Sequence, residues 1–250
     1  MGAENSQGEQ APTTARRNDI ESLPESFNEA EREVYESSEQ ARHVYRDESD
    51  DEDSTIGQRK EGYSKSVYYG EFKVISENPK TISREGKGIM FYKRGDAERR
   101  IKYFGEWKDD KFDGQGVLDL CGGAKYDGQW SQGKKEGKGS ERTENNSTYN
   151  GYFRNNKRSG HGRYKDSNGF DYVGLFKRGK RHGKGVLNFT NGDKFDGEFK
   201  ENIQAEGEYT FASGNVYTGK FDDTGVMNDD EASLVFAESG NEYKGPIKGG

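Results

Sequence analysis

A five-residue pattern, aromatic-x-Gly-x-aromatic, recurs along the chain and constrains its fold more than any other feature. Two of its copies are "YDGQW" at 126–130 and "YVGLF" at 172–176. The copies begin at Tyr68, Tyr103, Tyr126, Tyr149, Tyr172, Phe195 and Tyr217, with a partial copy at Tyr243. The middle copies are spaced 23 residues apart, and a Gly-x-Gly begins eleven residues after each of their starts. A fixed period of this length indicates a repeat array.

Alternation along an extended strand explains why a glycine stands between two rings. Residues i, i+2 and i+4 share one face of a strand, so Tyr126, Gly128 and Trp130 point one way. The polar residues Asp127 and Gln129 point the other way. The glycine leaves space in which a ring of the neighbouring copy is expected to lie over the backbone, so that the rings form a continuous stripe.

The second half of each copy predicts a second strand. Gly183, Gly185, Leu187 and Phe189 recur at period two, which places them on one face. Glycine-containing turns such as "TNGDK" at 190–194 separate the copies. Each copy is therefore predicted to be a β-hairpin, and seven hairpins give about fourteen strands.

These hairpins predict an all-β fold over 63–250, an elongated single antiparallel sheet of stacked copies. Only 28% of the chain is hydrophobic and 34% is charged, which excludes a conventional two-layer core over its whole length. Each copy is too small to be stable by itself, so neighbouring copies must stabilise one another. The copy at Tyr217 lacks the Gly-x-Gly and is expected to end the array.

Residues 1–62 differ in composition from the array and are predicted to be a mostly disordered acidic tail. They hold 17 acidic and 7 basic residues, whereas the whole chain has a net charge of −7. Within them, an amphipathic helix is predicted over about 26–46, with Ser26 and Glu29 as a capping box. This helix either packs on the end of the array or forms a coiled coil.

Two modification sites are candidates in the tail. The chain begins "MGAENS", which matches the acceptor pattern for N-myristoylation at Gly2. One myristoyl chain binds membranes only marginally, so a second membrane signal would be needed. Ser49 lies in the acidic run "DESDDED" at 47–53 and would suit an acidophilic kinase.

Basic residues recur at the same place in three successive copies. Residues 134–184 contain 14 Lys or Arg against 5 Asp or Glu. Stacking is expected to align six of these cations along one edge as a basic ridge: Lys134, Lys135, Lys157, Arg158, Lys180 and Arg181. The ridge either keeps a repetitive sheet soluble or binds an anionic partner, such as a membrane lipid or an acidic protein segment. Nucleic acid is disfavoured because the chain is acidic overall and no recognition helix is visible.

No catalytic residue, metal site or cofactor is predicted. The Gly-x-Gly pairs lack the third glycine and the strand-to-helix context of a dinucleotide site, and no Walker motif is present. The three histidines have no metal-ligand spacing, and the chain has a single cysteine, Cys121. No apolar run reaches the roughly 18 residues of a membrane span, and no signal peptide is recognised. We therefore expect a non-enzymatic cytoplasmic protein without a small-molecule substrate.

The repeat resembles the MORN repeat (membrane occupation and recognition nexus). Its aromatic-x-Gly-x-aromatic, short turn and Gly-x-Gly are complete in the copies that start at Tyr103, Tyr126, Tyr149 and Tyr172. One departure is the polar "SERTE" at 140–144, where other copies have apolar residues. The resemblance implies an elongated, twisted single sheet that is not catalytic. Family members serve as cytoskeletal and ciliary scaffolds, they often dimerise, and lipid binding has been proposed for several.

Two functions follow from these features. The first is a non-catalytic scaffold in a cytoskeletal or ciliary assembly, whose aromatic groove binds a protein partner or a second copy of the chain. The groove is predicted to consist of Tyr103, Trp107, Tyr126, Trp130, Tyr149, Phe153, Tyr172 and Phe176. The alternative is a peripheral membrane adaptor that uses myristoylated Gly2 and the basic ridge to bind anionic lipid on the cytoplasmic face of a membrane.

Overall fold

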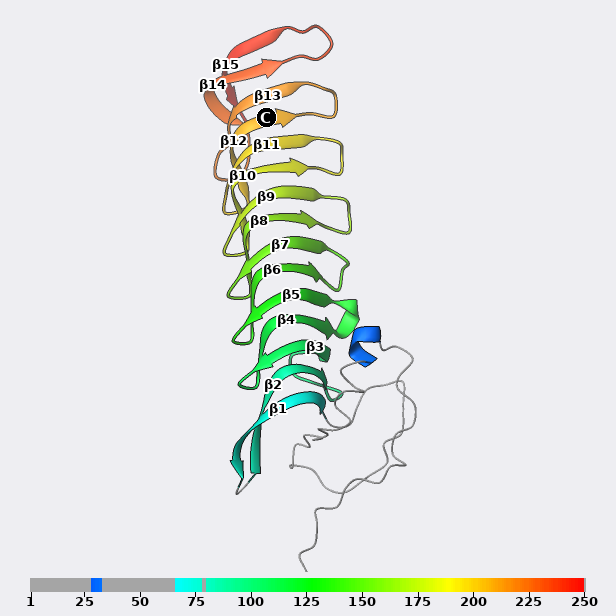
Figure 1. Cartoon of the computed structure of the whole chain (residues 1–250). Helices are drawn as coiled ribbons and strands as arrows, with labels where there is room; N and C mark the ends of the chain where they lie inside the picture. Colours follow the sequence, from blue (N-terminus) through cyan, green and yellow to red (C-terminus); the bar gives the residue numbers. More distant parts are fainter. Residues whose placement is uncertain (1–27, 33–65, 78–79, 250) are drawn as a thin grey trace, which may run out of the picture.

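The structure is a computed structural model that describes residues 28–32, 66–77 and 80–249. Within these residues, fifteen strands form one antiparallel sheet in which each strand pairs with its neighbours in chain order (Figure 1). The strands are β1 (Val67–Glu77), β2 (Lys80–Phe91), β3 (Arg100–Lys108), β4 (Lys111–Leu120), β5 (Lys125–Ser131), β6 (Lys134–Arg142), β7 (Thr148–Arg154), β8 (Lys157–Lys165), β9 (Asp171–Lys177), β10 (Lys180–Asn188), β11 (Lys194–Lys200), β12 (Ile203–Thr210), β13 (Val216–Lys220), β14 (Asn228–Val235) and β15 (Glu242–Lys248). A short 3-10 helix, η2 (Cys121–Gly123), follows β4. The predicted all-β sheet of stacked hairpins is confirmed.

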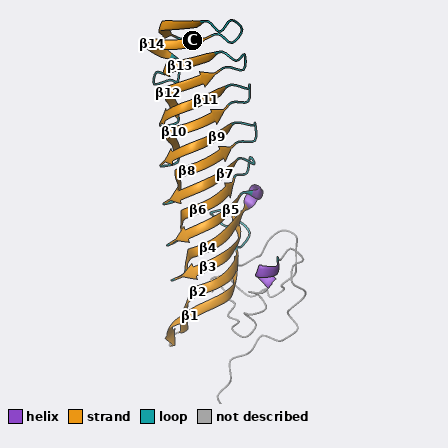
Figure 2. Cartoon of the chain, turned by 45° about the horizontal axis from the view of Figure 1, so that its top comes forward, coloured by secondary structure: helices purple, strands orange, loops and turns teal. Residues whose placement is uncertain are grey.

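Two-residue turns join the two strands of each middle copy. In the turn between β3 and β4, Asp109 and Asp110 both have positive φ, of 47° and 63°. Asn155 and Asn156 have φ of 49° and 65° between β7 and β8. Two such residues form the turn whose twist matches that of the flanking strands. The longer loops between copies lie along the other side of the stack (Figure 2).

In the five copies that begin at Tyr68, Tyr103, Tyr126, Tyr149 and Tyr172, the starting tyrosine lies over two glycines of its own hairpin. Gly128 and Gly139 are partners across β5 and β6. A Cβ atom would lie 2.8 Å from the Tyr126 hydroxyl at Gly128 and 2.5 Å from it at Gly139, so only glycine fits at either position. The Tyr126 hydroxyl donates a hydrogen bond to the carbonyl of Gln129 (2.9 Å). The ring over the glycines therefore belongs to the same copy, and not to the neighbouring copy as the sequence suggested.

The first glycine of the Gly-x-Gly forms a bulge. Gly183 has a φ of +72°, and the pairing of β9 with β10 shifts register between Arg181 and Gly185. A Cβ atom on Gly183 would meet Leu175, on the face away from the tyrosines, at 3.1 Å. The prediction that Gly183 and Gly185 share a face is therefore wrong, because residues 182–184 of β10 lie across from the single residue Leu175 of β9, and this bulge turns Gly183 away from the tyrosines.

The last strand, β15, is an edge of the sheet. Its Tyr243 is 43% exposed, whereas Tyr217 in β13 is fully buried, since β14 and β15 follow β13 while no described strand pairs with the outer side of β15. Lys220, at the equivalent position of β13, donates its backbone N–H toward β14, to Asp229 (3.0 Å). Pro246 of β15 has no N–H to offer on that side, which makes the edge a poorer template for a further strand. The copy at Tyr217 was expected to end the array, but the partial copy at Tyr243 adds this strand.

A helical turn over 29–32 is fixed to the sheet by an ion pair. Asn28 and Glu31 form a capping box, in which the backbone N–H of Glu31 donates to Asn28 Oδ1 (2.9 Å). The predicted box of Ser26 and Glu29 is not tested, because Ser26 lies outside the described residues. Glu31 is 3% exposed, and its carboxylate lies 2.5 Å from Lys102 Nζ in β3. The rest of the predicted helix over 26–46 lies outside the described residues, as do Gly2, Ser49 and the acidic run at 47–53.

Candidate functional site

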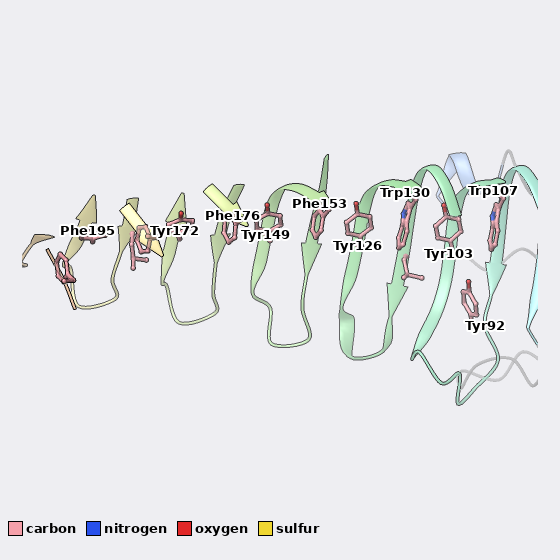
Figure 3. Packing of buried hydrophobic residues seen from close by; sticks show 14 of the residues in the cluster. Tyr92, Tyr103, Trp107, Tyr126, Trp130, Tyr149, Phe153, Tyr172, Phe176 and Phe195 are labelled. Carbon is pink, nitrogen blue, oxygen red and sulfur yellow. The ribbon is translucent and has the colours of Figure 1, made fainter. Parts of the chain in front are cut away.

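The eight rings predicted to line a groove form the core of the sheet. We call the side of the sheet that carries them the aromatic face and the other side the opposite face. Their exposed fractions run from zero, for the four tyrosines, to 6% for Trp130 and Phe176. The first ring of each copy packs edge-on against the second ring of its own copy and of the following copy: Tyr126 lies 4.9 Å from Trp130 and 5.1 Å from Phe153, between ring centroids. The same zigzag runs through Tyr149 and Tyr172 (Figure 3).

The rings themselves therefore offer almost no surface to a partner. This corrects the assignment of partner binding to these eight residues. Because a single sheet has no second layer, each ring is buried by its neighbours in the row and by the side chains above them. The surface available to a partner lies in these covering side chains.

The predicted basic ridge divides into two rows, because successive residues of a strand point to opposite faces. Lys134, Lys157 and Lys180 are exposed, whereas Lys135, Arg158 and Arg181 are half-buried. The half-buried cations lie across from the second ring of each copy; for example, Arg158 pairs with Phe153. These cations cover the rings: Lys135 Nζ lies 4.7 Å from the Tyr126 ring centroid and Arg158 Cζ lies 5.0 Å from that of Tyr149. The six residues thus do not form one ridge.

Two cations of the aromatic face share one carboxylate. Glu141 lies 2.5 Å from Lys135 Nζ and 3.0 Å from Arg158 Nη2. It occupies the position across from Tyr126 at which neighbouring copies have Leu118 or Tyr164. Burial opposes ionisation of Glu141, but the two cations outweigh it and hold the pKa of the carboxyl below its usual value. The polar "SERTE" segment thus supplies the counterion for two copies.

Arg181 has no carboxylate partner among the described residues. Its Nη2 donates to the backbone carbonyl of Asn202 (2.7 Å), and its Nη1 is buried without a hydrogen-bond partner. Its Cζ lies 5.0 Å from the Phe170 ring centroid and 5.4 Å from that of Phe199. Burial lowers the pKa of Arg181 from its ordinary value, although a guanidinium remains charged near neutrality. This cation is therefore held among rings with one donor unused.

A second row of rings lies beside these cations. It consists of Tyr164, Phe170, Phe189, Tyr209 and Phe211, all half-buried. Ring centroids of Phe170 and Phe189 are 6.1 Å apart, and those of Phe189 and Tyr209 are 5.6 Å apart. Arg158 Cζ lies 4.8 Å from the Tyr164 ring centroid, which joins the row to the cations. We call these five residues the second aromatic row.

Sequence reasoning missed the second aromatic row as a site. Phe189 was placed on the aromatic face by period two, but it was assigned only to the strand pattern. The signal that distinguishes it is position: these rings stand at the loop end of the second strand of a copy, or in the loop, where fewer neighbours cover them. The rings at the strand centres, which the repeat pattern selects, are those that become buried.

The repeats match a known family. The model of the MORN repeat matches residues 103–125, 126–148, 149–170, 172–194 and 195–216. This chain carries a MORN-repeat array. No curated protein matches the chain.

One solved structure to which the chain is similar is the SAS-4 (dCPAP) TCP domain of Drosophila melanogaster in complex with a proline-rich motif of Ana2 (dSTIL). The identity is 13% and the TM-score is 0.38, and the match covers 65% of this chain and 85% of that chain. At that identity and TM-score, the likeness carries no argument about function. In the part of the chain that the structure describes, no helix is long and apolar enough to cross a membrane.

Proposed function

We propose that this MORN-repeat protein is a non-catalytic scaffold that binds a segment of another protein on its aromatic face. The observation that carries this proposal is the second aromatic row, from Tyr164 to Phe211, next to Arg158 and Arg181. Aromatic and arginine side chains supply a large share of the binding energy at protein interfaces. Five half-buried rings on one face of β8 to β12 and the adjoining loops offer apolar surface that the chain itself leaves partly uncovered.

The setting is proposed from the resemblance to MORN proteins that act as scaffolds. We propose a cytoskeletal or ciliary assembly in the cytoplasm, in which a rod of stacked hairpins holds partners along its length. The partner is a protein segment or a second copy of this chain. No step of the proposal requires a cofactor, a metal or a small-molecule substrate.

A peptide selection tests the proposed function. A displayed library of random peptides is selected on the full chain, and binding of the enriched peptides is measured by fluorescence anisotropy. Peptides that bind wild type are expected to bind a Phe189→Ser/Phe211→Ser variant at least tenfold more weakly. The matched control is Tyr152→Ser, which removes an exposed ring (43%) from the opposite face. Circular dichroism establishes that the variants are folded.

Two outcomes would contradict the proposal. One is a selection that enriches no binding peptide on the full chain. The other is a set of peptides whose affinity depends on Tyr152 and is indifferent to Phe189 and Phe211. A second copy as partner would show as a concentration-dependent mass in analytical ultracentrifugation that the same double variant removes.

The alternative is a peripheral membrane adaptor. Its support is the exposed row of Lys134, Lys157 and Lys180, one lysine in each of three successive copies, which suits an anionic surface. Gly2 as a myristoylation site belongs to this alternative. The test is sedimentation with phosphatidylserine-containing vesicles, comparing wild type with a variant in which the three lysines are glutamines. Salt-sensitive binding that the variant loses would favour the adaptor.

A further inference from the structure

The aromatic face contains an internal example of how a carboxylate binds to it. Glu141 lies between two cations of successive copies, and Arg158 reaches back from β8 to bind it. The position from which Glu141 projects recurs one copy later at Tyr164, across from Tyr149 and Tyr172. Arg181 follows Tyr164 by 17 residues, as Arg158 follows Glu141, so the two pairs occupy equivalent positions in successive copies. The same arrangement is therefore present at Arg181, without the carboxylate.

The unused donor of Arg181 is costly as it stands. A buried polar group without a hydrogen bond loses the free energy of its contact with water, and the loss is larger for a charged group. Phe170, Tyr172 and Phe199 face the guanidinium, but none of them accepts a hydrogen bond from Nη1. A carboxylate oxygen would accept a hydrogen bond from Nη1 and balance the charge, as Glu141 balances the charge of Arg158 through its Nη2.

We propose that Arg181 is the anion-recognition point of the aromatic face and binds a glutamate or aspartate side chain of a partner segment, with apolar neighbours on the second aromatic row. This inference rests on the proposed function and specifies its partner. Apolar surroundings favour a singly charged carboxylate over a doubly charged phosphate, because each further charge adds to the cost of removing water. The partner is thus an acidic and apolar protein segment.

The nearest cations differ from Arg181 in their availability. Lys135 and Arg158 already share Glu141, and Lys180 pairs with Glu201 at 2.5 Å on the surface. Asn202 holds Arg181 in place from the neighbouring turn, since its side-chain oxygen accepts the Arg181 backbone N–H (2.9 Å) while its carbonyl accepts Nη2. The guanidinium is thereby positioned before a partner arrives, which lowers the ordering cost of binding.

The test uses the peptides enriched on the full chain, each synthesised in two forms. The acidic form has the enriched sequence. The amide forms are a series in which one Glu or Asp at a time is replaced by Gln or Asn. Wild type is expected to bind the acidic form about 10- to 100-fold more tightly at one such position, the range given by a hydrogen bond to a charged group. In Arg181→Gln the ratio of the acidic-form affinity to the amide-form affinity should fall to about one. In the matched control Lys180→Gln this ratio should stay at the wild-type value.

A second variant supplies the missing carboxylate from the chain itself. Tyr164→Glu places a carboxylate beside Arg181 in the position of Glu141 and also removes one ring of the second aromatic row, so both peptide forms should bind more weakly. The acidic form should lose more affinity than the amide form, whereas the matched Tyr164→Gln variant, which removes the ring and adds no carboxylate, should keep the wild-type ratio of the two affinities. Circular dichroism reports on the folding of each variant. If Arg181→Gln weakened the affinity for the acidic and the amide forms equally, the inference would be overturned, because Arg181 would then have a structural role.

The remaining outcomes also decide between possibilities. Peptides that bind through Phe189 and Phe211, with an affinity indifferent to Arg181, would overturn this inference and leave the proposed function intact. A selection that yields no peptide overturns both. Arg181-dependent binding to phosphatidylserine vesicles, with no preference among peptides, would assign the guanidinium to lipid and would also overturn the inference.

Discussion

The copies that begin at Tyr126 and Tyr172 pair their two strands in the same way. They differ in whether a carboxylate neutralises the cations on the aromatic face. In the first, Glu141 lies across from the starting tyrosine and neutralises Lys135 and Arg158. In the second, Leu187 takes that position and is 2% exposed, while Arg181 remains without a carboxylate. The two hairpins nevertheless place their rings alike, with centroids 4.9 and 5.1 Å apart. The ring and glycine frame therefore determines the fold, and the residue across from the tyrosine is free to vary between an ion and a hydrocarbon.

Removing a ring tests whether the frame contributes equally in the two copies. Trp130→Ala and Phe176→Ala each delete a side chain that is 6% exposed, and each should lower the free energy of unfolding by about 3–5 kcal/mol. Denaturant unfolding measures this loss. Hydrogen exchange should increase mainly in the mutated copy and its two neighbours. Unchanged protection around either ring would contradict its placement in the core.

Removing the carboxylate that Lys135 and Arg158 share tests the copy that begins at Tyr126 by itself. Glu141→Gln should cost about 1.5–3 kcal/mol at neutral pH, because it leaves Lys135 and Arg158 without their counterion. The Glu141 pKa is lowered in the folded state, so its contribution is fully present above the ordinary value of 4.5 and is lost as the pH falls below it. Urea unfolding across this range should show a steeper acid loss for wild type than for the variant. Equal slopes would mean that the carboxylate does not ionise differently on folding.

Alkaline titration tests a feature common to the copies that begin at Tyr149 and Tyr172, the buried hydroxyl of the starting tyrosine. Burial raises the pKa of Tyr149 and of Tyr172 from 10.0 to about 12. The raised pKa stabilises the folded chain fully below pH 10.0, and this contribution is lost as the pH rises toward 12. Phenolate absorbance should therefore appear together with unfolding. Tyr149→Phe/Tyr172→Phe should show a shallower alkaline loss, and Phe195, which starts a copy without a hydroxyl, indicates that this variant folds.

The smallest change in stability is expected at the surface of the copy that begins at Tyr172. Lys180 pairs with Glu201, and both side chains are about half exposed (50% and 55%). Solvent and salt screen such a pair, so Lys180→Gln should change the free energy of unfolding by less than about 1 kcal/mol. Thermal denaturation in parallel with Glu141→Gln gives the comparison. A loss as large as that of Glu141→Gln would mean that exposure does not separate the two ion pairs.

The sequence was sufficient for the array because its pattern is local and repeated. The spacing of Tyr126, Gly128 and Trp130 determines which side chains share a face, and each later copy repeats the inference. The bulge at Gly183 was not predictable from period two, since Arg181 and Gly185 keep the face that the alternation gives them and only the glycine between them is turned away. The candidate site was harder, because exposure depends on what covers a ring. The spacing of the residues predicts neither the burial of Trp130 nor the half-exposure of Phe189.

The strand order has a mechanical consequence. The strands run across the long axis of the stack, with β1 at one end and β15 at the other (Figure 1). A pulling force between the two ends would load the hydrogen bonds of one strand pair at a time, as in opening a zipper, and would not shear many pairs at once. The hydroxyls of starting tyrosines such as Tyr126 and Tyr149 bond within their own strands, and their rings cover glycines of their own hairpins, so a detached hairpin leaves the contacts inside the next copy intact. A tether built in this way would lengthen in steps of one hairpin under tension and would regain its length by re-pairing when the tension falls.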